Sequence, residues 1–252
     1  MLHAGAMPGT PHATDPVEQL VDRAVAEARI YRDSGFTGLL LENMHDRPYL
    51  NGSVGPEVVA VMTAVAREVR RAVALPLGVQ VLAAANHEAL AVALASGADF
   101  VRVEGFAFAH VADEGLIQAC AGPLLRYRRA VGAERVRVYA DIKKKHSSHA
   151  ITGDVSLAET ARAAEFFSAD GVIVTGAATG APCLPDDLEA VADDVRIPVL
   201  VGSGLTADTL ARYARARGFI VGSSVKHGGL WSNALDSAAA AALARAFERL
   251  PP

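Results

Sequence analysis

Acidic and basic side chains alternate near the end of the apolar segment 136–146. Valine, alanine and isoleucine occupy positions 136, 138, 140 and 142, whereas Arg137, Tyr139, Asp141 and Lys143 lie between them. Since side chains alternate faces along a strand, we expect the polar set on one inward face, where burial is costly unless the groups are paired or functional. We therefore expect Asp141 and Lys143 to take part in proton transfer. Lys143 would act as a proton shuttle or, if its pKa is lowered, as the amine that forms a Schiff base.

The residues that follow are assigned by the same alternation. Lys144 falls on the opposite face, so we expect it to be solvated, and Lys145 faces inward only if the strand continues that far. His146 and His149 are interpreted as loop residues.

Other strand ends carry groups of the same kind. Val101 and Val103 are expected to face outward, which leaves Arg102 and Glu104 inward. A purely structural layer of ion pairs is the alternative to chemistry. The predicted catalytic or substrate-contacting residues are His3, Glu42, Arg102, Glu104, Asp141 and Lys143.

Two glycine- and serine-rich turns follow short apolar runs late in the chain. Glycine lets the backbone approach a ligand closely, and successive free N–H groups bind anions. The loops after strands 7 and 8 of a (β/α)₈ barrel commonly bind phosphate, and a following lysine could neutralise it. Tight turns without a ligand are the alternative. The predicted phosphate-binding residues are Gly202, Ser203, Gly204, Gly222, Ser223, Ser224 and Lys226.

No established metal or cofactor motif is recognised. The chain has no Ser–His–Asp order, zinc signature or phosphate-binding P-loop. Carboxylates at strand ends could hold a divalent metal, but their spacing does not demand one, so no metal site and no cofactor are assigned. Cys120 and Cys183 fit a reducing compartment better than a disulfide framework.

Alternating strands and helices are expected to position these residues. Similar joins, such as Ser34–Leu40 and Ser96–Arg102, lead from a helix into a buried strand, which is typical of a parallel sheet. We predict an α/β fold, a single (β/α)₈ TIM barrel over residues 1–252. An open doubly wound sheet is the alternative, but no Gly-x-Gly-x-x-Gly follows the first strand. That strand, within Met1–Ala6, is short, and its start could lie upstream.

Helix starts are predicted from capping residues. Asp15 is an N-cap candidate with Glu18 as its partner, and Ser156 with Glu159 forms a capping-box pattern. Further helices are expected over 116–131, over 207–217 after Thr206, and over 233–250.

Composition restricts the class of protein. The 252 residues are 51% hydrophobic and carry a net charge of −4, with no basic stripe, which argues against nucleic acid. No apolar run is long enough for a membrane span, and the start lacks signal-peptide features. We expect a cytoplasmic homo-oligomer; peripheral membrane association stays open.

Segments along almost the whole chain match those of a known family. They are 3–11, 41–43 with 46–48, 78–82 with Asn86, 100–103, 140–146, 173–176 with Thr179 and Gly180, 201–204 and 220–226. In these segments the chain resembles the BtpA/SgcQ family, and the resemblance implies a barrel fold. Cyanobacterial members are described as photosystem I biogenesis factors, and others lie beside sugar-metabolism genes or are called nucleotide hydrolases.

These observations favour an enzyme of lyase or isomerase type. Its substrate would be a small phosphorylated metabolite such as a phosphosugar or a nucleotide-like compound. A non-catalytic assembly factor for a membrane complex and a phosphate-ligand sensor are the alternatives.

Overall fold

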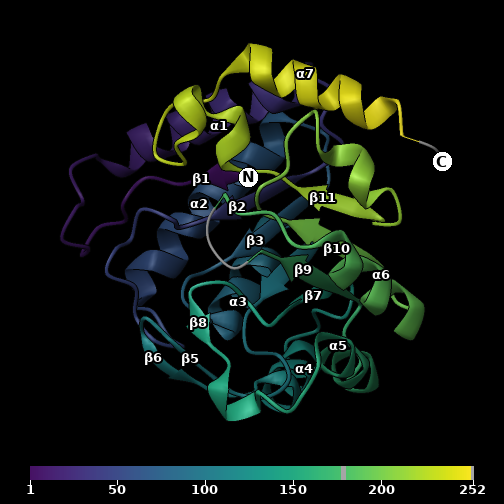
Figure 1. The fold of residues 1–252 in the computed structure, drawn as a ribbon. Coiled ribbons are helices and arrows are strands. Elements are labelled where there is room, and N and C mark those ends of the chain that lie inside the picture. The colour runs from purple at the N-terminus through teal and green to yellow at the C-terminus, as the bar shows by residue number, and fades with distance from the viewer. Residues whose placement is uncertain (177–179, 251–252) are drawn as a thin grey trace. The chain divides into compact units, whose positions relative to one another are not determined.

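Eight strands form one sheet in the order in which they occur along the chain, β1-β2-β3-β4-β7-β9-β10-β11 (Figure 1). The computed structural model describes residues 1–176 and 180–250. Sequential strand order with intervening helices is the arrangement of the predicted TIM barrel. The strands are β1 (Leu2–His3), β2 (Leu39–Glu42), β3 (Leu77–Gln80), β4 (Phe100–Val103), β7 (Arg137–Ile142), β9 (Gly171–Thr175), β10 (Val199–Gly202) and β11 (Gly218–Ile220).

The helices alternate with these strands and supply apolar faces to the core. Residues such as Leu20, Val65 and Leu90 are buried on their inner sides. The helices are α1 (Val17–Asp33), α2 (Pro56–Ala72), α3 (Asn86–Ser96), α4 (Ala121–Ala130), α5 (Leu157–Phe166), α6 (Pro185–Asp194) and α7 (Ser237–Glu248).

The chain divides into two compact units. The first comprises Met1–Val103 and Gly122–Arg137, and the second Glu104–Ala121 and Val138–Pro252. In the first unit β1 to β4 pair in parallel, and α1, α2 and α3 pack on one another beside them. In the second, β7, β9, β10 and β11 pair in parallel, and α5 and α6 pack against β9 and β10. The single-domain organisation stays a prediction.

A three-stranded antiparallel sheet in the second unit is missing from the sequence prediction. β5 (His110–Ala112) pairs with β6 (Gly115–Ile117) and with β8 (Ser147–Ser148). The helix expected to begin at Leu116 therefore begins at Ala121 instead. The reason is local: Gly115, at φ 108°, follows the turn of a hairpin, which places Leu116 opposite Val111.

The predicted helix over 207–217 is wrong. The structure has only a 3₁₀ turn, η2 (Leu210–Tyr213), in this part of the chain. Its buried side chains, Leu210 and Tyr213, are three residues apart, which matches the 3₁₀ repeat, and the Tyr213 hydroxyl donates to the Cys183 carbonyl at 2.7 Å.

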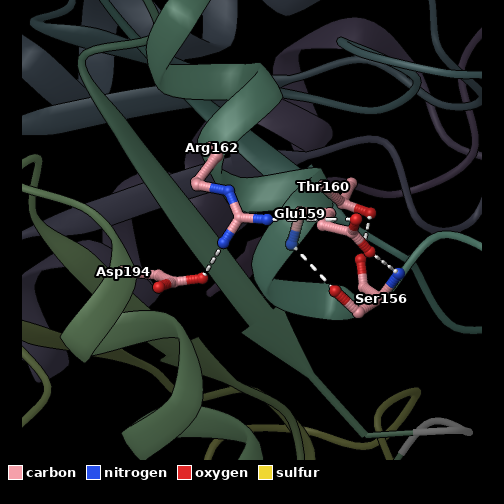
Figure 2. Close-up of polar contacts among 5 residues, drawn as sticks. All are labelled: Ser156, Glu159, Thr160, Arg162 and Asp194. Carbon is pink, nitrogen blue, oxygen red and sulfur yellow. Dashed lines mark hydrogen bonds and ion pairs between the residues drawn. The ribbon is translucent and has the colours of Figure 1, made fainter.

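The cap predictions have different outcomes. Figure 2 shows the confirmed capping box of α5: the Glu159 N–H donates to Ser156 Oγ at 3.1 Å, and the Ser156 N–H donates to Glu159 Oε2 at 2.8 Å. The Asp15 cap is wrong, because Pro16 is the N-cap residue of α1 and Asp15 pairs with Arg23 instead. Asp236 caps α7, which begins at Ser237 and not at 233.

None of the described helices is long and apolar enough to cross a membrane. Residues 177–179, which include Thr179 of the family-like segments, lie outside the described residues.

Candidate functional site

A polar pocket in the second unit lies where the chain leaves β7. Its empty space, about 300 Å³, includes open solvent. Asp141 comes from β7, His110 from the start of β5, and Lys143, Lys144 and His149 from the segment that follows β7. The pocket therefore combines one carboxylate, two ammonium groups and two imidazoles.

Lys144 is buried in an ion pair, so the expectation of a solvated side chain is wrong. Its Nζ lies 3.3 Å from Glu104 Oε1, and both side chains are less than one-tenth exposed. The alternation of faces stops at Ile142, where β7 ends, and Lys143 has a left-handed backbone at φ 44°. This turn directs Lys144 toward Glu104. The alternation of side chains along a strand could not predict this direction, because the strand has already ended.

Lys143 also lies at the pocket, half-buried. Its Nζ donates to the Thr152 carbonyl at 3.3 Å, which holds the side chain beside the short 3₁₀ turn η1 (Ala150–Thr152). Asp141 is buried at 7% exposure. The predicted pair of Asp141 and Lys143 thus lines one pocket, and whether it is catalytic stays a prediction.

His110 and His149 line the pocket, although neither is among the predicted site residues. Their ring centroids lie 5.4 Å apart, and His149 Nε2 lies 2.9 Å from the Lys144 carbonyl oxygen. A carbonyl only accepts, so this nitrogen of His149 carries the proton. Burial, with help from the Lys144 and His149 charges, lowers the pKa of His110 to about 4, although Glu104 acts in the opposite direction. Short apolar segments on either side of the polar pair Asp113 and Glu114 were the sequence signal for this hairpin, which carries His110.

The turn after β10 has the backbone expected of a close-approach loop. Ser203 and Gly204 are both left-handed, at φ 73° and 64°, and Ser203 Oγ accepts the Gly180 N–H at 3.2 Å. A Cβ on Gly204 would lie 2.2 Å from the backbone nitrogen of Pro182. The packing of the chain therefore already requires glycine at position 204, so the presence of glycine there is no separate evidence of a ligand.

The turn after β11 continues into a 3₁₀ turn, η3 (Ser223–Val225), with Gly222 as its N-cap. Ser223 and Ser224 are half-buried. Lys226 is buried at 3% exposure and forms an isolated antiparallel bridge with Leu235. The anion-binding role of these residues stays a prediction.

The remaining candidates belong to the first unit. His3 and Glu42 occupy paired positions on β1 and β2, and His3 Nε2 lies 3.7 Å from Glu42 Oε2. Arg102 is buried on β4 at 7% exposure. A second polar network joins neighbouring loops: Asp46 accepts from the Met7 N–H at 2.7 Å and from Asn43 Nδ2 at 2.9 Å.

Among residues 1–176 and 180–250, no group of three or more His, Cys, Asp and Glu side chains is arranged to hold a metal ion.

Proteins of similar sequence cover almost the whole chain. A family model described as the BtpA family matches residues 1–249. An uncharacterized mitochondrial protein of Caenorhabditis elegans is 47% identical over 243 residues, which are 94% of this chain and 87% of that protein. The photosystem I biogenesis protein BtpA of Synechocystis is 34% identical over 238 residues, which are 94% of this chain and 82% of that protein.

Solved structures of similar fold are TIM-barrel proteins, so the predicted fold class is confirmed. The thiamine phosphate pyrophosphorylase of Pyrococcus furiosus superimposes with a TM-score of 0.59 at 16% identity, over 93% of this chain and 94% of that one. The (S)-3-O-geranylgeranylglyceryl phosphate synthase of Thermoplasma acidophilum, solved with sn-glycerol-1-phosphate, gives 0.60 at 14% identity, over 90% of this chain and 87% of that one. At these identities the likeness extends to the fold alone.

Proposed function

Because the chain belongs to the BtpA family and has a TIM-barrel fold, we propose that it is an enzyme acting on a small phosphorylated metabolite. The observation that carries the proposal is the pocket lined by Asp141, Lys143 and Lys144, with Lys144 in a buried ion pair with Glu104. Buried charges are costly to maintain, and such clusters in a pocket are typical of active sites.

The pocket offers the parts of a proton-transfer reaction. The Asp141 carboxylate is the general base that accepts a proton from the substrate. The Lys143 ammonium stabilises the negative oxygen that develops, and Glu104 holds Lys144 nearby as a second positive charge. Return of the proton to a neighbouring atom gives an isomerase, and loss of a leaving group gives a lyase.

The turns after β10 and β11 are the proposed phosphate-binding site. They belong to the same unit as the pocket, and left-handed backbone at Ser203 and Gly204 suits a loop that presents N–H groups to an anion. Both similar enzymes described above carry a phosphate compound in their names, which supports the assignment by analogy only.

The test is a turnover screen followed by phosphorus NMR. Wild-type protein is incubated with sugar phosphates and nucleotides, and consumption of each is measured. For a consumed compound, Asp141→Asn and Lys143→Met should each lower kcat by about 10²–10⁴-fold, the usual contribution of general acid–base catalysis. Full activity in both variants would refute the assignment of these residues.

An assembly-factor role is the second candidate, since one relative is named a photosystem I biogenesis protein. Co-sedimentation with membranes, together with no turnover of any compound in the screen, would favour it over the enzyme. Binding of a phosphate compound without turnover would favour a sensor.

A further inference from the structure

His110 has a buried nitrogen that no described residue satisfies. The residue is 6% exposed, and its Nε2 has no hydrogen-bond partner among residues 1–176 and 180–250. An unsatisfied polar atom inside a protein is costly, and such atoms are uncommon. This one belongs to a side chain that lines the pocket.

The hairpin holds His110 firmly in this position. His110 pairs with Ile117 across β5 and β6, and a Cβ on Gly105 would lie only 2.5 Å from Ile117 Cγ2. β5 is also paired with β8 on its other edge. The backbone is therefore fixed at His110 by Ile117 and at the next two residues by β8, and the ring is held at the pocket wall.

The groups around His110 favour a neutral ring. Burial disfavours its protonation most, the charges of Lys144 and His149 add to that effect, and the Glu104 carboxylate acts against them. A neutral imidazole presents one N–H and one lone pair, so it suits an uncharged partner better than a phosphate.

We propose that His110 is a substrate-binding residue whose Nε2 hydrogen-bonds a hydroxyl group of a phosphorylated sugar or polyol. A hydroxyl both donates and accepts, so it matches either tautomer of the ring. Asp141 accepts from further hydroxyls in the same pocket, and Lys143 donates to them. The inference rests on the proposed function and adds a substrate class: a phosphate ester that carries hydroxyl groups.

Titration calorimetry with matched ligands tests the proposal. Glycerol 3-phosphate and propyl phosphate share a three-carbon chain and differ in two hydroxyls; ribose 5-phosphate places hydroxyls farther from its phosphate. Wild-type protein should bind one of the two hydroxylated esters about tenfold more tightly than propyl phosphate, the scale of a good hydrogen bond.

Variants of His110 connect that preference to this ring. His110→Leu should abolish the preference, whereas His110→Gln, whose amide reaches about as far as Nε2, should retain part of it. His12→Leu, at an exposed histidine outside the pocket, should change nothing. Inorganic phosphate should bind all variants equally, and melting without ligand confirms that they are folded.

Two outcomes distinguish failure of the inference about His110 from failure of the proposed function on which it rests. If inorganic phosphate and propyl phosphate bind but hydroxyls add no affinity, or if His110→Leu keeps the preference, His110 has no such role although the phosphate site stands. If no phosphate compound binds, the phosphate site is wrong and the inference is overturned with it.

Discussion

Lys144 and Glu104 form an ion pair that is almost entirely removed from solvent, at 9% and 8% side-chain exposure. Removal of one partner leaves the other charge buried and uncompensated, which typically costs about 3–5 kcal/mol. We expect Lys144→Met and Glu104→Gln each to lower the free energy of unfolding by that amount. The double variant should lose less than the sum of the two, as measured by denaturant unfolding.

An exposed pair provides the control for this cycle. Arg71 and Glu68 are 3.0 Å apart at 69% and 44% exposure, so Arg71→Met should cost less than about 1 kcal/mol. Additive losses at Glu104 and Lys144 would contradict the energetic coupling of the buried pair.

His110 should make stability depend on pH in a specific direction. Its pKa falls from 6.5 in the unfolded chain to about 4 in the fold, so between these values the unfolded state binds a proton that the folded state does not. The free energy of unfolding should therefore fall as the pH is lowered from 6.5 toward 4.

Comparison with His110→Gln isolates this contribution, because carboxyl groups also titrate at the lower end of the range. The variant should lose less stability across that range in urea unfolding at a series of pH values. Parallel pH profiles for the two proteins would show that His110 is protonated equally in both states.

Gly204 and Gly132 separate backbone strain from steric crowding. Both are left-handed, at φ 64° and 69°, but a Cβ would meet the Pro182 nitrogen at 2.2 Å only in Gly204, with nothing within 4 Å at Gly132. Gly132→Ala should cost about 1–2 kcal/mol for its backbone alone, and Gly204→Ala about 1–3 kcal/mol more for the contact. Equal losses in thermal unfolding would mean that residues 181–182 move aside freely.

Among the helices, the start of α5 depends on its cap in a way that the start of α1 does not. Ser156→Ala removes the acceptor for the Glu159 N–H and should cost about 1 kcal/mol (Figure 2). Asp15→Ala removes only an exposed contact to Arg23, so its cost should be a few tenths of a kcal/mol. A larger loss for Asp15→Ala in thermal unfolding would indicate a capping role that the structure does not contain.

Apolar periodicity was sufficient to predict the strands of the large sheet. β1 lies within Met1–Ala6 and β7 within segment 136–146, as expected, since buried parallel strands are short, continuous and apolar. Shorter elements were missed: β8 has only Ser147 and Ser148, and nothing in two polar residues predicts pairing with β5. A local sequence pattern predicts an element poorly where pairing with a distant segment decides its structure.

The same limit applies to the candidate site. Alternation correctly predicted that Arg102, Glu104 and Asp141 would be buried, because they lie on or directly after regular strands. It was wrong for Arg137, which is exposed at the start of β7. It failed at Lys144, one residue after a left-handed backbone at Lys143. The alternation of side chains between the two faces of a strand can be used only while the strand continues, and functional groups often come just after its end.

At the scale of the whole molecule, the fold limits the chemistry only loosely. TIM barrels support many reactions through the loops that follow their strands, so the eight-stranded order cannot select one. The two turns after β10 and β11 and the pocket around Asp141 carry the functional claim, and both can be tested without a known substrate.

A thermal-shift series with phosphate, sugar phosphates and nucleotides tests that claim most directly. A ligand at a hundred times its Kd adds about 2.7 kcal/mol, which corresponds to roughly 5–11 °C in a domain of this size. The matched variants are Ser223→Asp, which places a negative charge in the proposed phosphate turn, and Ser232→Asp, at an exposed serine outside it. The account predicts a shift of that size for a phosphate ester in the wild type and in Ser232→Asp, and its loss in Ser223→Asp. No shift with any phosphate compound, or an equal shift in all three proteins, would contradict it.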